Sequence, residues 1–283
     1  MVRTTTLTAA LAATAALTLG LTACGTASDP KPSGSDGGDA ALTVAASATP
    51  HAEILEYVRD NLAEEAGLDL DVKVFNDYVL PNTATESGDV DANYFQHRPY
   101  LDDFNAKNGT HIVPVVDVHL EPLGLYSESA RALADIGPGD TVAIPNDTTN
   151  GGRALKLLDT HALIELKDGA GQDATLADIA DRKGLTFKEL EAATLPRALG
   201  EVDAAVINGN YAIEAGLNPE KDAFAREAAE GNPYANFLAV KEGDEDDPRI
   251  GKLAELLNSA EVRAFIEDEY QGSVVPAFGA PRD

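Results

Sequence analysis

Short apolar runs and amphipathic stretches alternate along the chain from residue 42 onward, and this alternation limits the folds open to it. Residues 70–74 alternate apolar and charged side chains, which is the period of a β-strand. Residues 112–120 form the longest run rich in β-branched side chains and also predict a strand. Four shorter apolar runs predict buried strands: 42–45, 141–144, 204–207 and 237–240.

Helical periodicity lies between these strands. After the first strand, Thr49 is a candidate N-cap with Pro50 at the first helical position, and the helical spacing stops before Gly67. Further helices are predicted over residues 152–163, from residue 247 and from residue 259. Strand and helix in turn predict an α/β architecture with largely parallel sheets.

Residues 1–23 have the composition of a secretory signal peptide. They contain one basic residue, Arg3, no acid, and an apolar run too short and too rich in Ala and Thr for a bilayer-spanning helix. The run ends Leu-Thr-Ala-Cys at residues 21–24, which has the form of a bacterial lipobox. Cys24 is the only cysteine in the chain, and we expect it to carry the lipid. The alternative is an ordinary signal peptide in which this cysteine occurs by chance.

Residues 24–40 are predicted to form a flexible tether, because they are almost wholly small, polar or Pro residues without apolar periodicity. The remaining stretch of about 240 residues suits one large domain or two lobes. Two acyl chains on Cys24 would hold the protein at the extracytoplasmic face of the cell membrane. A lone thiol forms no intrachain disulfide, so the fold must be held by its core.

The net charge argues against one class of partner. The chain has 21 basic and 48 acidic residues, for a formal net charge of -27. Such a surface repels phosphate backbones, so we expect no nucleic-acid partner. The scattered acids favour a solvated acidic face.

Five polar and aromatic clusters lie at or near the ends of predicted strands, where α/β folds place their ligands. They contain aromatic side chains, several amides and Arg153, which is in the first turn of a predicted helix. Arginine can grip a carboxylate through two hydrogen bonds, amide oxygens accept from an ammonium, and aromatic faces cover an aliphatic or thioether chain. This set suits a zwitterion with an apolar tail. The clusters are residues 75–78, 91–97 with 99–100, 145–153, 207–211 and 232–236.

Each of these residues also has a structural explanation. Asn150 is a common turn and N-cap residue type, and Tyr78 and Phe95 fit a hydrophobic core equally well. Arg153 fits an exposed helix start, and His97 fits a hydrogen-bonded structural histidine. The residue types alone leave both explanations open.

Six phrases in order along the chain carry a resemblance to a known family. They are Phe-Asn-Asp-Tyr-Val-Leu-Pro-Asn (75–82), Asp-Ala-Asn-Tyr-Phe-Gln-His (91–97), Glu-Pro-Leu-Gly-Leu-Tyr-Ser (121–127), Ile-Pro-Asn-Asp-Thr-Thr-Asn-Gly-Gly-Arg-Ala-Leu (144–155), Ala-Val-Ile-Asn-Gly-Asn-Tyr-Ala (205–212) and Pro-Tyr-Ala-Asn (233–236). Over residues 41–278 the chain resembles the NlpA-type methionine-binding lipoproteins, the solute receptors of a methionine ABC importer.

The resemblance implies a type II periplasmic-binding-protein fold, in which two α/β lobes enclose a ligand cleft. Residues 41–122 and 235–283 would form one lobe, and residues 123–234 the other. It also implies L-methionine or a similar amino acid as ligand, and a membrane permease with its cytoplasmic ATPase as partner. The chain itself has no Gly-x-x-x-x-Gly-Lys-Ser/Thr loop, so we expect it to hydrolyse no nucleotide.

The resemblance also implies the ligand-binding residues. Arg153 matches the family's carboxylate-binding arginine, with Asn150 beside it. Asn208 and Asn236 match its amide contacts to the amino-acid head group. The residues that match its aromatic wall around the methionine side chain are Tyr78, Phe95 and His97.

The chain departs from commoner family forms at three positions. Thr148 stands where many relatives have proline, and Gly209 where threonine is usual. Glu121 occupies a place where some relatives carry tyrosine. If Glu121 faces the cleft, it could pair with the ligand ammonium.

Other functions are less well supported by the sequence. No Gly-x-Ser-x-Gly elbow and no His-Glu-x-x-His helix occur, so we expect no enzyme, no catalytic residue and no cofactor. The five histidines show no metal-ligand spacing, so we expect no metal site. The remaining alternatives are a lipoprotein for adhesion or scaffolding, and a receptor of the same family for another apolar amino acid or a methionine dipeptide.

Overall fold

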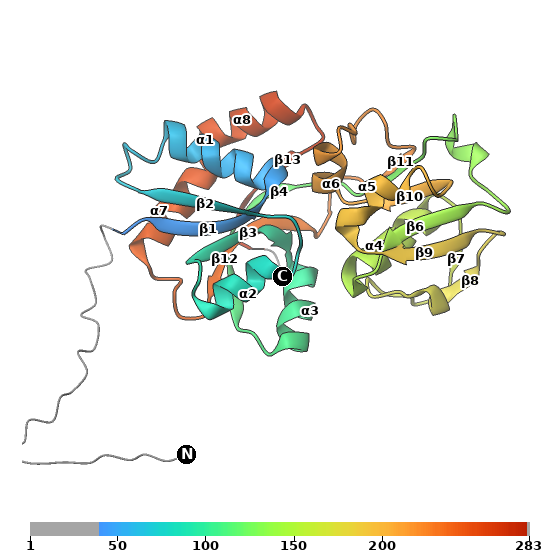
Figure 1. The fold of residues 1–283 in the computed structure, drawn as a ribbon, viewed down its shortest axis with the longest axis horizontal. Helices are drawn as coiled ribbons and strands as arrows, with labels where there is room; N and C mark the ends of the chain where they lie inside the picture. Colours follow the sequence, from blue (N-terminus) through green and yellow to red (C-terminus); the bar gives the residue numbers. More distant parts are fainter. Residues whose placement is uncertain (1–39, 282–283) are drawn as a thin grey trace, which may run out of the picture. The chain divides into compact units, whose positions relative to one another are not determined.

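Figure 1 shows the computed structural model, which describes residues 40–281. All of these residues belong to one compact unit. The predicted signal peptide, the lipidation site Cys24 and the tether up to residue 39 lie outside the described residues. No helix within residues 40–281 is long and apolar enough to cross a membrane.

The first lobe is built on a six-stranded sheet in the order β13-β4-β12-β3-β1-β2. Strand β1 is parallel to β2 and β3, whereas β12 is antiparallel to β3 and β4, and β13 is antiparallel to β4. The bounds are β1 Leu42–Ser47, β2 Leu70–Phe75, β3 Ala92–His97, β4 Ile112–Leu120, β12 Ala235–Lys241 and β13 Val275–Gly279.

The second lobe is built on a five-stranded sheet in the order β11-β5-β10-β6-β9. Strand β6 is parallel to β9 and β10, whereas β5 is antiparallel to β10 and β11. A two-stranded ribbon, β7 Glu165–Leu166 with β8 Ile179–Asp181, accompanies it. The main-sheet bounds are β5 Gly124–Tyr126, β6 Thr141–Pro145, β9 Thr186–Leu190, β10 Ala204–Ile207 and β11 Ala225–Arg226.

Both sheets are mixed, so the expectation of largely parallel sheets was wrong. In the first lobe the reason is the path of the chain. Strand β4 ends just before the second sheet begins, and β12 starts just after that sheet is complete. One strand therefore leaves the lobe and the other returns to it, so the two pair antiparallel. The α/β class itself is confirmed.

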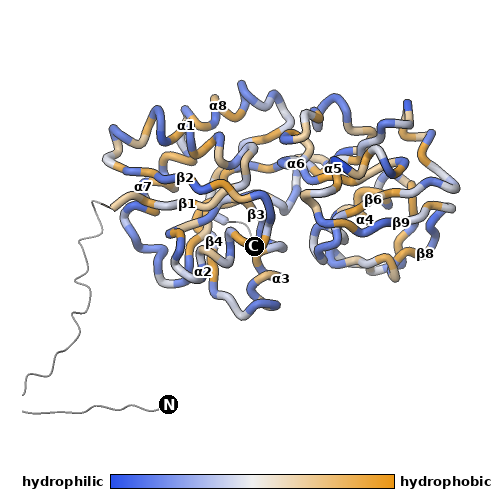
Figure 2. The backbone as a smooth tube through the Cα atoms, in the orientation of Figure 1, coloured by the Kyte–Doolittle hydropathy of each residue, from blue (hydrophilic) through white to orange (hydrophobic). Residues whose placement is uncertain are grey.

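Helices cover the sheets of both lobes (Figure 1). In the first lobe, α1, α7 and α8 pack with β1 on one buried apolar cluster that includes Ile54, Leu253 and Ile266. In the second lobe, Leu155 and Leu158 of α4 pack with Ile144 of β6. Figure 2 shows hydrophobic segments along both of these elements. The helices are α1 Glu53–Asn61, α2 Leu80–Ser87, α3 Arg98–Asn108, α4 Thr148–Thr160, α5 Leu195–Ala198, α6 Gly209–Glu214, α7 Pro248–Leu257 and α8 Ala260–Tyr270, with short helical turns at Ala48–Ala52, Leu133–Asp135, Leu176–Asp178 and Ala192–Thr194.

Two helix starts differ from prediction. Helix α1 begins at Glu53, because Thr49 has extended backbone angles and its hydroxyl donates to the Glu53 carboxylate instead of capping a backbone N–H. Helix α4 begins at Thr148, four residues before the predicted start. The Asp147 side chain accepts from the backbone N–H of Asn150 and so caps the helix earlier.

Candidate functional site

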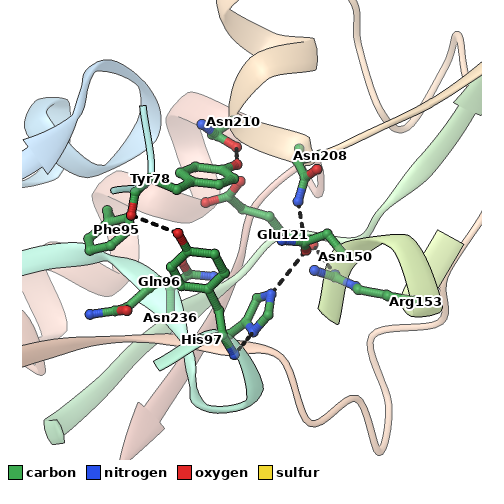
Figure 3. A pocket seen from close by; sticks show the side chains of 12 residues that line it. Tyr78, Phe95, Gln96, His97, Glu121, Asn150, Arg153, Asn208, Asn210 and Asn236 are labelled. Carbon is green, nitrogen blue, oxygen red and sulfur yellow. Dashed lines mark hydrogen bonds between the residues drawn. The ribbon is translucent and has the colours of Figure 1, made fainter. Parts of the chain in front are cut away.

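A cavity between the two lobes is lined by residues from both of them (Figure 3). The seven residues predicted to bind ligand all line it, and five others join them. The lining residues are Tyr78, Phe95, Gln96, His97, Tyr100, Glu121, Asn150, Arg153, Asn208, Gly209, Asn210 and Asn236.

Aromatic rings form one wall of the cavity. The ring centroid of Tyr78 lies 6.0 Å from that of Phe95 and 5.7 Å from that of Tyr100. The Tyr100 hydroxyl donates to the backbone oxygen of Tyr78 at 2.8 Å, which fixes the two rings relative to each other. Such a wall can cover an aliphatic or thioether chain.

A buried amide network holds the strand that carries this wall. Strand β3 is buried along its whole length although half of its residues are polar. Gln96 pairs with Asn82 through two hydrogen bonds of 2.8 and 2.7 Å, and Asn93 donates to Asn82 and Thr85. Because each amide finds a partner, the polar side chains can be buried here. Phe95 and His97 are thereby placed at the cavity.

His97 links the two lobes. It caps α3, since its Nδ1 accepts from the backbone N–H of Tyr100, and its Nε2 therefore donates to Oδ1 of Asn150 at 3.1 Å. Burial, with the nearby charge of Arg153, lowers the pKa of His97 to about 3. The imidazole is therefore neutral near pH 7.

Arg153 is held by Glu227, a residue that sequence reasoning missed. Its Nε donates to Oε1 of Glu227 at 2.8 Å, and its Nη2 donates to Oε2 at 2.6 Å. Nη2 also donates to the backbone oxygen of Glu121, and the guanidinium lies 4.1 Å from the ring centroid of Tyr234. Nη1 makes no hydrogen bond with any described residue, so it remains free to donate to a ligand.

The amides differ in how far they are already engaged. Oδ1 of Asn150 accepts from both His97 and Asn208, and its Nδ2 donates to Asp147, so this side chain ties together parts of the site. In contrast, Oδ1 of Asn208 and Nδ2 of Asn210 are buried and have no hydrogen-bond partner among residues 40–281. An unsatisfied buried polar atom is costly, and a bound ligand would supply the missing partner.

A histidine–carboxylate cluster lies at the cavity floor. Oε1 of Glu121 accepts from Nε2 of His119 at 2.7 Å and lies 3.3 Å from Nε2 of His51, which is also 3.0 Å from Oδ1 of Asn236. Sequence spacing did not reveal this group, because His51 lies 68 residues before His119 along the chain. Potential ligand atoms of these two histidines and Glu121 lie within 4.8 Å of one another, close enough to hold a metal ion. Within residues 40–281 this is the one such group of histidine, cysteine or acidic side chains.

Comparison with known proteins identifies the family. The family model described as NlpA lipoprotein matches residues 42–278. The chain belongs to the NlpA lipoprotein family. The family assignment made from the six sequence phrases is therefore confirmed.

Members of the NlpA family with assigned names or solved structures are similar over most of this chain. The methionine-binding lipoprotein MetQ of Bacillus subtilis is 42% identical over 248 residues, 86% of this chain and 90% of that protein. A nutrient-binding protein of Burkholderia cenocepacia, solved bound to methionine, is 46% identical with a TM-score of 0.81, covering 84% of this chain and all of that one. An ABC transporter periplasmic substrate-binding protein of Coxiella burnetii is 40% identical with a TM-score of 0.80, covering 83% of this chain and all of that one.

These relatives confirm the two-lobed periplasmic-binding-protein fold of this NlpA-family chain. They are named as binding proteins or lipoproteins, and none of the three names describes catalysis. Four lining residues lie within the predicted polar and aromatic clusters but were not predicted individually to bind ligand: Gln96, Tyr100, Gly209 and Asn210. Glu227 lies in none of these clusters. Glu227 follows a two-residue strand and carries no pattern that could have found it.

Proposed function

We propose that this chain is a lipid-anchored extracytoplasmic receptor that binds L-methionine, or a close analogue, and delivers it to an ABC importer. The observation that carries the proposal is the cavity itself. It combines an aromatic wall, one free guanidinium nitrogen and unpaired amide atoms, as a zwitterion with an apolar tail requires. Family relatives named as methionine-binding, and one solved with methionine, support this ligand.

Each predicted residue has a role in the proposed complex. The ligand carboxylate would accept from Nη1 of Arg153, which Glu227 holds in place. Asn208 and Asn236 would contact the head group. Tyr78, Phe95 and His97 would enclose the side chain, while Asn150 would join His97 to Asn208.

Contacts across the cleft support a closing mechanism. Besides the His97–Asn150 bond, the Tyr78 hydroxyl donates to Oδ1 of Asn210 at 2.6 Å, and Nζ of Lys107 donates to Oγ1 of Thr148 at 2.6 Å. A ligand touching both lobes would add to these contacts only in the closed form, and would therefore shift the population toward it. The closed receptor would then dock on the permease, whose ATPase supplies the energy.

The direct test is ligand occupancy and selectivity. Protein without its lipid is purified, and any released ligand is identified by mass spectrometry. After the ligand has been removed by unfolding and refolding, L-methionine at about 100 times its dissociation constant should stabilise the protein by roughly 2.7 kcal/mol. A thermal shift with leucine or a methionine dipeptide but none with L-methionine would contradict the methionine assignment. No shift with any amino acid or dipeptide would contradict a receptor function of this kind.

Delivery is tested separately in cells. Cys24→Ser should leave the purified protein's affinity for L-methionine unchanged and reduce uptake, because the receptor is no longer held near its permease. Uptake at the wild-type rate would contradict the role of the anchor.

A further inference from the structure

Glu121 places a carboxylate at the cavity floor, immediately after strand β4. The residue is 6% exposed and lines the cavity. Its carboxylate accepts from Nε2 of His119 at 2.7 Å and from the backbone N–H of Asn210, and lies 3.3 Å from Nε2 of His51. Figure 3 shows the Glu121 side chain among the lining residues, on the side of Asn210 and Tyr78.

The groups that hold this carboxylate are uncharged. The Tyr94 hydroxyl pairs with Nδ1 of His119, so Nε2 of that ring is the donor toward Glu121. Burial lowers the pKa of His119 to about 3 and that of His51 to about 4. Both imidazoles are therefore neutral near pH 7, and they orient the carboxylate without balancing its charge.

The fixed positive charge of Arg153 is already paired with another carboxylate. The guanidinium of Arg153 forms two hydrogen bonds with the carboxylate of Glu227, and its contact with Glu121 goes to the backbone oxygen. The only ion-pair partners of Glu121 within residues 40–281 are His51 and His119. Burial raises the pKa of Glu121, as expected for a carboxylate that lacks a cation.

Two residues of the second lobe lie beside Glu121. Gly209 leaves space for the Glu121 side chain, and Asn208 offers a hydrogen-bond acceptor. A Cβ atom on Gly209 would lie 2.7 Å from Cβ of Glu121 and 3.1 Å from its Oε2, so glycine is required for Glu121 to sit where it does. Oδ1 of Asn208, on a residue 6% exposed, has no partner in the described part of the chain. The cavity thus presents a carboxylate without a cationic partner and an amide oxygen without a donor.

We infer that Glu121 is the counter-ion for the ammonium group of the ligand and that it selects compounds carrying a charged amine. An ammonium supplies both the positive charge that Glu121 lacks and a donor for Oδ1 of Asn208. A buried charge is tolerated when it is paired and hydrogen-bonded, which explains why the carboxylate can face this cavity. The inference rests on the proposed function, since it presumes an amino-acid ligand.

The test compares two ligands on the same protein preparation by calorimetry. They are L-methionine and 4-(methylsulfanyl)butanoate, which has the same carboxylate and thioether but no amine. Wild-type protein should bind L-methionine at least about 30-fold more tightly, because the second compound leaves Glu121 buried and unpaired. In Glu121→Gln this preference should fall below about 10-fold, since the charge to be matched is gone. The ratio of two dissociation constants is independent of the fraction of protein that is folded.

Two further variants sharpen the result. Glu191→Gln removes an exposed carboxylate that lines the outer part of the cleft, so it should keep the wild-type ratio. Gly209→Ala keeps the charge of Glu121 but displaces the Glu121 side chain. This variant should weaken the binding of L-methionine more than the binding of 4-(methylsulfanyl)butanoate. An unchanged ratio in Glu121→Gln, with L-methionine still bound, would overturn the Glu121 assignment alone. Wild-type protein that binds neither compound would overturn the proposed function as well.

Discussion

The guanidinium of Arg153 and the carboxylate of Glu227 face each other edge to edge, with Nε 2.8 Å from Oε1 and Nη2 2.6 Å from Oε2. Their side chains are only 4% and 13% exposed. The Glu227 carboxylate also accepts from the backbone N–H of Leu123 and from Nδ2 of Asn232. Arg153 is therefore held in one orientation before any ligand arrives, with Nη1 as its remaining donor.

Glu227→Gln should weaken L-methionine binding although Glu227 does not line the main cavity. The amide replaces one of the two acceptor oxygens by an NH2 group, so Nε and Nη2 cannot each donate to an oxygen of their own. Arg153 then loses its fixed orientation and stays buried without a counter-charge. Breaking one side of a buried pair costs about 3–5 kcal/mol of stability, so the free energy of unfolding should fall by this order. Urea unfolding and calorimetric titration measure the two effects.

A nearby exposed ion pair supplies the matched control for this variant. Glu220 pairs with Arg226 at the surface, where such a pair contributes about 0–1 kcal/mol. Glu220→Gln should therefore change neither stability nor affinity appreciably. If Glu227→Gln behaved like Glu220→Gln, the Arg153–Glu227 pair would not organise the site.

Asn236→Ala should reduce the affinity for L-methionine with little change in fold stability. The side chain is 6% exposed and reaches the cavity from β12, where water cannot replace a lost hydrogen bond. A buried group left unpaired costs about 1–3 kcal/mol, which corresponds to a loss of roughly 5- to 150-fold. His51 can still donate to Glu121 in this variant, so the cluster of His51, His119 and Glu121 should keep its structure. Calorimetric titration measures this affinity. A wild-type value in Asn236→Ala would show that Asn236 does not contribute to ligand binding.

The protein should lose stability on acidification below pH 6.5 because of its buried histidines. Burial lowers the pKa values of His51, His97 and His119 to about 4, 3 and 3. Between pH 6.5 and about 4, the unfolded chain binds protons at these positions and the folded protein does not. The free energy of unfolding therefore decreases as the pH is lowered through this window, by about 1.4 kcal/mol per pH unit for each histidine. Urea unfolding at pH 7, 6 and 5 measures the slope.

One variant isolates this effect from that of the carboxyl groups. Burial raises the pKa values of Glu121 and Asp147, which gives a contribution of the opposite sign. Comparing variants at each pH cancels that contribution. His97→Asn keeps a side chain able to cap α3 and should reduce the slope by about 1.4 kcal/mol per pH unit. An identical slope in the variant would show that His97 is not held neutral by the fold.

The fold was predictable where one local pattern dominated. The β-branched run 112–120 became strand β4 with the predicted bounds, and the apolar run 204–207 became β10. Strand β3 escaped prediction because its polar side chains are buried by mutual hydrogen bonds, which no local periodicity reveals. Strands β5 and β11 have three and two residues, too few for any period to appear.

The site was predictable in its residue types but not in its pairings. The phrases that carried the family resemblance contain all seven predicted residues, and the structure brings them to one cavity. The partner of Arg153 is 74 residues away, and the floor of the cavity joins His51 to His119 and Glu121. Such contacts depend on how the two sheets are assembled, so the spacing of residues within one segment cannot predict them.

The Tyr78 hydroxyl joins the two lobes, so Tyr78→Phe should speed ligand release. The substitution keeps the ring in the aromatic wall and removes only the 2.6 Å bond to Oδ1 of Asn210. One hydrogen bond contributes about 0.5–1.5 kcal/mol, so the dissociation rate should rise roughly 2- to 10-fold if that bond forms mainly in the closed state. Tyr57→Phe is the matched control, because Tyr57 stacks on Phe265 within the first lobe. Stopped-flow release of L-methionine from both variants measures the difference, and equal rates would mean that the Tyr78–Asn210 bond does not hold the cleft closed.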